Sequence, residues 1–145
     1  MGIKVGIIGC GSITKLRHAP EYMANPFVDE IVFYDRNPER AEALAVMFDG
    51  AVEQDVDKLL TDPTIQVISD CSSNESHHIF STKALLNGKH VLCEKPISLT
   101  IEHAKEILDA QKQSGKKLMV DHNQRFTRAH QRRKKSLKVK NLVKC

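Results

Sequence analysis

Short runs of apolar residues alternate along the chain with longer segments in which apolar residues recur every three to four positions. The runs are rich in β-branched residues and end at glycine or polar residues, a pattern typical of buried strands. The longer segments have the periodicity of amphipathic helices. We therefore expect strands at 3–8, 30–34, 66–69, 91–93 and 118–120, and helices at 13–24, from Pro38 to about Asp49, at 55–60, at 77–86 and between Thr100 and Gly115.

Residues that favour helix ends lie beside several of these segments. Asn37 is expected to cap the helix that begins at Pro38. Ser12 and Thr100 are expected to cap two further helices with their side chains. Gly88 lies just beyond the end of another helix. Strands and helices that alternate at this spacing form βαβ units. The sequence therefore predicts an α/β fold, a Rossmann-type doubly wound parallel sheet with helices on both faces.

The composition indicates a soluble globular domain. The 145 residues are 41% apolar and 28% charged, and no run approaches the roughly 18 apolar residues that a membrane span requires. The first residues lack the pattern of a signal peptide, so we expect a cytoplasmic protein with no membrane partner. The four cysteines have neither a Cys-x-x-Cys motif nor metal-ligand spacing, which predicts buried, reduced thiols and no metal site.

Charge is distributed unevenly along the chain. The net charge is +4, yet residues 126–145 hold eight Lys or Arg and no acid, whereas residues 1–125 carry a net charge of −4. We therefore expect an acidic globular domain over 1–126 and a basic tail over 127–145. Basic runs bind phosphates, so nucleic acid or an acidic partner is one interpretation of the tail. The tail has no aromatic residues for base stacking, which disfavours nucleic acid.

A glycine-rich loop stands between the first expected strand and the helix that follows it. In Gly9-x-Gly11-x-x-Thr14, the first glycine permits a tight turn and the second lets a pyrophosphate approach the backbone at the helix N-terminus. Ser12 and Ile13 belong to the same loop, and Thr14 replaces the Gly or Ala that is usual at the third position. The loop predicts a dinucleotide site, with a methyl donor such as S-adenosylmethionine as the alternative ligand.

An acidic residue at the end of the second strand supports the prediction that the ligand is a dinucleotide. Asp35 lies 24 residues beyond Gly11, near the spacing at which an acid binds the ribose 2′-hydroxyl of the cofactor. The charge of Asp35 would repel a 2′-phosphate, whereas Arg36 beside it would tolerate one. We therefore predict NAD as the cofactor, with NADP as the alternative.

A lysine follows the strand expected at 91–93. In Glu94-Lys95-Pro96, the lysine stands at the carboxyl end of a strand, which is the edge where open α/β sheets bind ligands. A lysine at that edge can take part in proton transfer. A solvated surface charge is the alternative interpretation of Lys95.

Five segments carry a resemblance to a known family, and the run at 88–96 is the most specific of them. They are Gly-Cys-Gly-Ser-Ile at 9–13, His18, Asp35 with Asn-Pro-Glu-Arg-Ala at 37–41, Gly-Lys-His-Val-Leu-Cys-Glu-Lys-Pro at 88–96, and Arg125-Phe126. From about Ile3 to Phe126 the chain resembles the Gfo/Idh/MocA family, the group of glucose–fructose oxidoreductase, inositol 2-dehydrogenase and rhizopine-catabolism proteins.

The resemblance implies an NAD(P)-dependent oxidoreductase that transfers a hydride between the nicotinamide and the carbon of a sugar or cyclitol hydroxyl. Lys95 matches the family lysine that orients the hydroxyl and helps to move its proton, which makes it the catalytic candidate. Glu94 would line the nicotinamide side, and Arg125 matches an arginine near the cofactor. The family usually reads Pro-Asn-x-x-His after its fourth strand, and here Ser73 replaces the proline. The cofactor-binding candidates are Gly9, Gly11, Ser12, Ile13, Asp35, Arg36, Ser72, Asn74, His77, Glu94, Lys95 and Arg125.

Members of this family continue into a second α/β domain, which supplies most substrate contacts, a second acid–base group and usually an oligomer interface. We expect that domain to be absent from this chain and the chain by itself to be inactive. A homo-oligomer is an open alternative to a monomer. A one-base slip near codons 133–135 would explain the tail as out-of-frame sequence. The alternatives are a non-catalytic dinucleotide-binding module and a protein whose basic tail binds nucleic acid or another partner.

Overall fold

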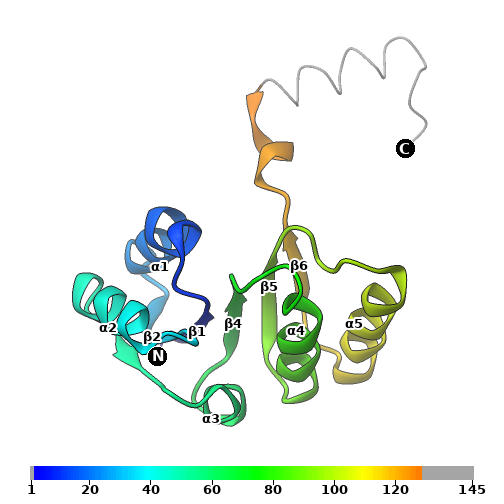
Figure 1. Cartoon of the computed structure of the whole chain (residues 1–145), viewed down its shortest axis with the longest axis horizontal. Helices are drawn as coiled ribbons and strands as arrows, with labels where there is room; N and C mark the ends of the chain where they lie inside the picture. Colours follow the sequence, from blue (N-terminus) through cyan, green and yellow to red (C-terminus); the bar gives the residue numbers. More distant parts are fainter. Residues whose placement is uncertain (1, 129–145) are drawn as a thin grey trace.

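The computed structural model describes residues 2–128, and six parallel strands within this range form one sheet (Figure 1). The predicted tail and its two explanations fall almost entirely outside the described residues. The strands are β1 (Ile3–Ile8), β2 (Val28–Tyr34), β3 (Ala51–Val52), β4 (Val67–Asp70), β5 (His90–Glu94) and β6 (Leu118–Asp121). Their order in the sheet is β3-β2-β1-β4-β5-β6, and all neighbours pair in parallel. This topology confirms the predicted Rossmann-type sheet.

Helices cover both faces of the sheet, as predicted (Figure 1). The α-helices of the described part are α1 (Ala19–Met23), α2 (Pro38–Met47), α3 (Val56–Thr61), α4 (His77–Leu86) and α5 (Ile101–Ser114). Buried side chains form two clusters. One joins α1 and α2 to β1 and β2, and the other joins α3, α4 and α5 to β4 and β5. Each face therefore has its own apolar core, which fixes the strand ends that carry the candidate site.

Two of the three expected helix caps are present. The Asn37 side chain accepts a hydrogen bond from the backbone N–H of Glu39 at 3.1 Å. The Thr100 hydroxyl oxygen accepts one from the N–H of His103 at 3.2 Å. Ser12 differs from the prediction because it is itself helical, and the segment that follows begins without a side-chain cap.

The helix expected at 13–24 is not a regular α-helix. Its first part is a π-helical segment, η1 (Thr14–His18), which continues directly into α1. A π-helical turn holds more residues than an α-helical one. Two further elements were also not predicted, the two-residue strand β3 and the short 3-10 helix η2 (Asn123–Phe126).

The strand order reverses between β1 and β4. In doubly wound sheets the crevice outside the carboxyl ends of the strands at such a point is where ligands bind. The end of β1 leads into the glycine loop, and the end of β4 leads into residues 71–76. The topology thus brings two of the predicted cofactor segments to one edge of the sheet.

The cysteines of the described part are buried and reduced, as predicted. Cys10, Cys71 and Cys93 are free thiols, and Cys145 lies outside the described residues. Burial is the largest cause that raises the pKa of Cys10, and likewise that of Cys93, to about 12. Both therefore stay protonated near neutral pH. No helix within residues 2–128 has the length and apolar character needed to cross a membrane.

Candidate functional site

The two glycines of the loop have different surroundings. Gly9 has a φ of 95°, in the left-handed region that favours glycine. A Cβ at Gly9 would lie 2.7 Å from the carbonyl carbon of Cys71 and 2.8 Å from the nitrogen of Ser72. At Gly11 a Cβ would meet no atom within 4 Å. The fold therefore requires Gly9, whereas Gly11 leaves open space beside the backbone.

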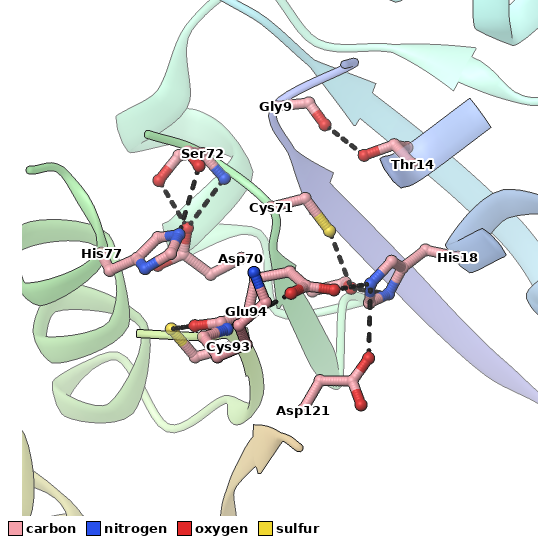
Figure 2. Close-up of polar contacts among 12 residues, drawn as sticks. Gly9, Thr14, His18, Asp70, Cys71, Ser72, His77, Cys93, Glu94 and Asp121 are labelled. Atoms are coloured by element: carbon pink, nitrogen blue, oxygen red, sulfur yellow. Dashed lines mark hydrogen bonds and ion pairs between the residues drawn. The ribbon is translucent and has the colours of Figure 1, made fainter. Parts of the chain in front are cut away.

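Thr14 closes the loop from the helix side (Figure 2). Its hydroxyl donates to the carbonyl oxygen of Gly9 at 2.5 Å, and its side chain is fully buried. Thr14 is larger than the usual Gly or Ala, and it fits this position because its buried hydroxyl is hydrogen-bonded to the loop. Ser12 and Ile13 are exposed in the first helical turn beside the loop.

The Asp35 carboxylate is fixed by backbone amides on both of its oxygens. Oδ2 accepts from the N–H of Cys10 at 2.7 Å, and Oδ1 accepts from the N–H of Asn37 at 2.8 Å. A carboxylate has further lone pairs, so Asp35 can still accept hydrogen bonds from ribose hydroxyls. The acid is therefore hydrogen-bonded to the backbone of the glycine loop.

A cavity of about 270 Å³ opens at the carboxyl edge of the sheet. It lies between the glycine loop, the end of β2 and the loop that follows β4. Arg40, in the first turn of α2, also lines it and was not among the predicted site residues. Its place in the first turn of the helix that begins three residues after Asp35 is the sequence signal that could have identified it. The predicted residues that line the cavity are Gly9, Gly11, Asp35, Arg36 and Ser72.

Asp70 supports the loop after β4 from inside the fold. Its side chain is fully buried, and its oxygens accept from the hydroxyls of Ser72 at 2.6 Å and Ser81 at 2.8 Å. Burial raises the pKa of Asp70, while the two hydroxyl hydrogen bonds and the nearby His77 oppose the rise. Because Ser81 lies on α4, Asp70 holds Ser72 in a fixed position at the cavity wall.

His77 connects the loop after β4 to the turn after β5, and Figure 2 shows its contact with Ser72 in the first of these. Its Nδ1 lies 2.6 Å from the carbonyl oxygen of Pro96, and its Nε2 lies 3.1 Å from that of Ser72. The ring is 1% exposed, so both nitrogens serve the protein backbone. His77 is not among the residues that line the cavity, and Asn74 is exposed in the turn before it.

Glu94 and Lys95 are consecutive residues at the end of β5, but their side chains differ in exposure. Glu94 is buried, with Oε1 at 2.9 Å from Nε2 of His18. Its Oε2 accepts a hydrogen bond from the backbone N–H of Lys95 at 3.2 Å. The Lys95 side chain is exposed at the edge of the sheet. Glu94 therefore braces the backbone of Lys95 and leaves its amine accessible.

His18 joins the ends of three strands (Figure 2). Besides Glu94, its Nδ1 lies 3.1 Å from the hydroxyl of Ser69, and its Nε2 lies 3.8 Å from Oδ2 of Asp121. Burial, the largest single effect, lowers the pKa of His18, but interactions with Cys71 and with Glu94 outweigh it and raise the pKa to about 9. The ring is therefore protonated at neutral pH, beside two carboxylates. No sequence motif marks Asp121, and sequence reasoning missed it.

Arg125 is separated from the residues above. It lies on η2, in the segment after β6 that leads away from the sheet (Figure 1), and its side chain is exposed. The structure thus brings the glycine loop, Asp35, Arg36 and Ser72 to one cavity. It places Glu94 and Lys95 at the end of β5 and Arg125 beyond β6.

The relatives found by comparison with known proteins agree with one another. A family model described as an oxidoreductase family with an NAD-binding Rossmann fold, Gfo/Idh/MocA, matches residues 3–122. The chain is 34% identical to D-glucoside 3-dehydrogenase of Escherichia coli (strain K12), covering 86% of the chain and 36% of that protein. It is 32% identical to inositol 2-dehydrogenase of Pseudomonas fluorescens (strain SBW25), covering 82% and 36%. The chain thus spans about a third of the length of these relatives.

A solved structure agrees with the sequence relatives. The 3-ketoreductase of Actinomadura kijaniata, crystallised with NADP and TDP-benzene, superposes with a TM-score of 0.87 at 25% identity. The match covers 95% of this chain and 42% of that protein. The family match, the strand order and the loop geometry together lead to one conclusion. This chain belongs to the Gfo/Idh/MocA oxidoreductase family and contains its NAD(P)-binding Rossmann domain.

Proposed function

We propose that this domain binds its dinucleotide across the carboxyl edge of the sheet and, within the whole protein, serves hydride transfer to or from a sugar or cyclitol carbon. The observation that carries the proposal is the cavity shared by the glycine loop and Asp35, at the point where the strand order reverses. Membership of an NAD-binding oxidoreductase family supports the same conclusion.

The residues around the cavity fit a dinucleotide. Open space beside Gly11 suits the approach of a pyrophosphate to the backbone. Asp35, held by two backbone amides, would accept from the ribose hydroxyls. Its charge disfavours a 2′-phosphate, whereas Arg36 and Arg40 on the same cavity would attract one. We infer that NAD binds in preference and that NADP is accepted.

A bound nicotinamide supplies the hydride acceptor for oxidation and the hydride donor for reduction. In the oxidative direction the carbinol carbon would give its hydride to the nicotinamide as the C=O bond forms, and the hydroxyl proton would pass to Lys95, whose amine must be in its neutral form to accept it. The exposed amine of Lys95 can reach a substrate at the edge of the sheet. Glu94 positions Lys95 through the backbone N–H, and His18 in turn holds the Glu94 carboxylate.

The substrate class rests on the relatives. The dehydrogenases of Escherichia coli and Pseudomonas fluorescens are named for a glucoside and for inositol, both polyhydroxylated rings. We propose a ring alcohol of this chemical class as the substrate of the whole protein. The part of each relative outside the matched region would supply further contacts to it.

Calorimetric titration of the 145-residue chain with NAD and with NADP tests the cofactor part of the proposal. We expect tighter binding of NAD, and Asp35→Asn should weaken NAD binding and narrow the difference between the two cofactors. Glu42→Gln, an exposed acid on α2, serves as the control and should change neither affinity. Absence of binding for both cofactors would refute the proposal.

A further inference from the structure

A group of metal-ligand side chains lies on the two helices α4 and α5, away from the dinucleotide cavity. His78 on α4 and His103 on α5 stack their imidazole rings, with centroids 3.6 Å apart and planes at 4°. Glu106 lies three residues after His103, on the same side of α5. One ligand atom from each of the three side chains lies within 4.8 Å of the others.

The three side chains have no other polar role in the described part of the chain. Among residues 2–128, neither ring nitrogens of His78 and His103 nor the carboxylate of Glu106 form a hydrogen bond or an ion pair with the protein. The two histidines are partly buried and the glutamate is exposed, so ions in solution can reach them. Their lone pairs are thus available to a cation.

Two imidazoles and one carboxylate are ligands that zinc takes in sites where water fills the fourth position. Imidazole nitrogen distinguishes this set from sites for Mg²⁺ or Ca²⁺, which prefer oxygen ligands. From these observations we propose that His78, His103 and Glu106 form a binding site for a divalent cation of the zinc class, which links α4 to α5.

Binding requires a change at the rings. The lone pairs of an imidazole lie in the ring plane, so two parallel rings cannot both direct them at one ion. Rotation about the Cβ–Cγ bonds, which these partly buried side chains allow, turns the nitrogens of His78 and His103 toward a common point. The ion therefore replaces the ring stack as the contact between the helices.

A second cluster makes a useful comparison. Ligand atoms of His18, Glu94 and Asp121 also lie within 4.8 Å of one another. There, however, Nε2 of His18 is hydrogen-bonded to Glu94 at 2.9 Å and the ring is 5% exposed. A cation would have to displace the proton of His18 from a buried network. We therefore assign the ion to the α4–α5 site. The His18 cluster is the alternative site that the test must distinguish from it.

The test is Zn²⁺ binding to the metal-free 145-residue chain, measured by competition with a chromophoric chelator. We expect one Zn²⁺ per chain, bound at least roughly tenfold more weakly by His78→Ala and by His103→Ala. Glu106→Gln alters an exposed side chain, leaves the fold intact and should also weaken binding. His122→Ala, which removes an exposed histidine outside the cluster, is the matched control and should bind as tightly as the parent chain.

Nitrogen-15 NMR of the histidine side chains identifies the ligands directly. Zn²⁺ should shift the ring nitrogens of His78 and His103 and leave those of His18 unchanged. Zn²⁺ should also raise the melting temperature of the parent chain and not that of His103→Ala, because the ion joins two helices. Equal affinity in the parent chain and all three cluster variants, or Zn²⁺-dependent shifts confined to His18, would overturn the proposal. Since none of these residues lines the dinucleotide cavity, the result does not depend on cofactor binding.

Discussion

At the scale of single residues, the two glycines of the loop have separate roles that their shared motif conceals. Gly9 is fixed by its left-handed backbone and by the neighbouring backbone of Cys71 and Ser72. Gly11 contacts nothing that a side chain would displace. The motif therefore combines a glycine that the fold needs with one that leaves open space for the proposed ligand.

Substitutions at the two positions should separate stability from binding. Gly11→Val should leave the free energy of unfolding nearly unchanged and weaken NAD binding roughly a hundredfold, about 2.8 kcal/mol, because the side chain fills the space for the pyrophosphate. Gly9→Ala should lower the free energy of unfolding by about 2 kcal/mol or more through backbone strain and contact with Cys71. Urea unfolding and calorimetry of both variants measure the two effects. Unchanged NAD affinity in Gly11→Val would refute the placement of the loop.

The protonated state of His18 should make stability depend on pH. The pKa in the folded chain, about 9, is above the ordinary value of 6.5. The stabilisation is therefore fully present below about pH 6.5 and is lost as pH rises through 9, by roughly 3 kcal/mol. Urea unfolding at several pH values between these limits measures the loss. His18→Gln, which cannot be protonated, should show a flatter profile, and equal slopes for the two chains would contradict the prediction.

At the scale of elements, the sequence predicted best where one local feature decides the structure. Asn37 and Thr100 cap their helices as expected, and the helix at 77–86 has the predicted bounds. The first strand also has its predicted bounds, 3–8, whereas the bounds of the other predicted strands differ by one or two residues at one or both ends. The π-helical segment η1 was missed because apolar periodicity cannot distinguish its wider turn from an α-helix. The strand β3 has two residues, too few for any pattern.

The cap of α5 offers a test at this scale. Thr100→Ala should lower the free energy of unfolding by about 1 kcal/mol, because the N–H of His103 loses its side-chain acceptor. Thr100→Ser keeps an acceptor oxygen at the same place and should retain most of the stability. Thermal and urea unfolding of both variants provide the comparison. A similar loss in both would show that the methyl group of Thr100, and not its hydroxyl, is responsible.

At the scale of the whole molecule, the sheet topology assembles a site whose parts are far apart in the sequence. The fold class and the glycine loop could be predicted because each depends on a local pattern. The support of Glu94 by His18 spans 76 residues, and Asp121 lies on yet another strand, so no local signal connects them. His77 could be selected from its motif, but its position between two loops depends on tertiary contacts.

The arrangement of the site also predicts how the chain behaves by itself. The residues that line the proposed dinucleotide cavity all lie within the described part of this chain, whereas the relatives have about two thirds of their length outside the region that this chain matches. We therefore expect the 145-residue polypeptide to bind NAD without oxidising glucosides or inositol. Calorimetry measures the binding, and the absorbance of reduced nicotinamide measures turnover.

Lys95→Met serves as the reference for background in that assay, since it removes the proposed proton acceptor without touching the residues that line the cavity. Equal, negligible turnover in the parent chain and in Lys95→Met would agree with the expectation, provided that both bind NAD. Turnover by the parent chain that Lys95→Met abolishes would contradict it. Such a result would mean that the carboxyl edge of this sheet, with Lys95 at the end of β5, holds a ring alcohol without contacts from any further domain.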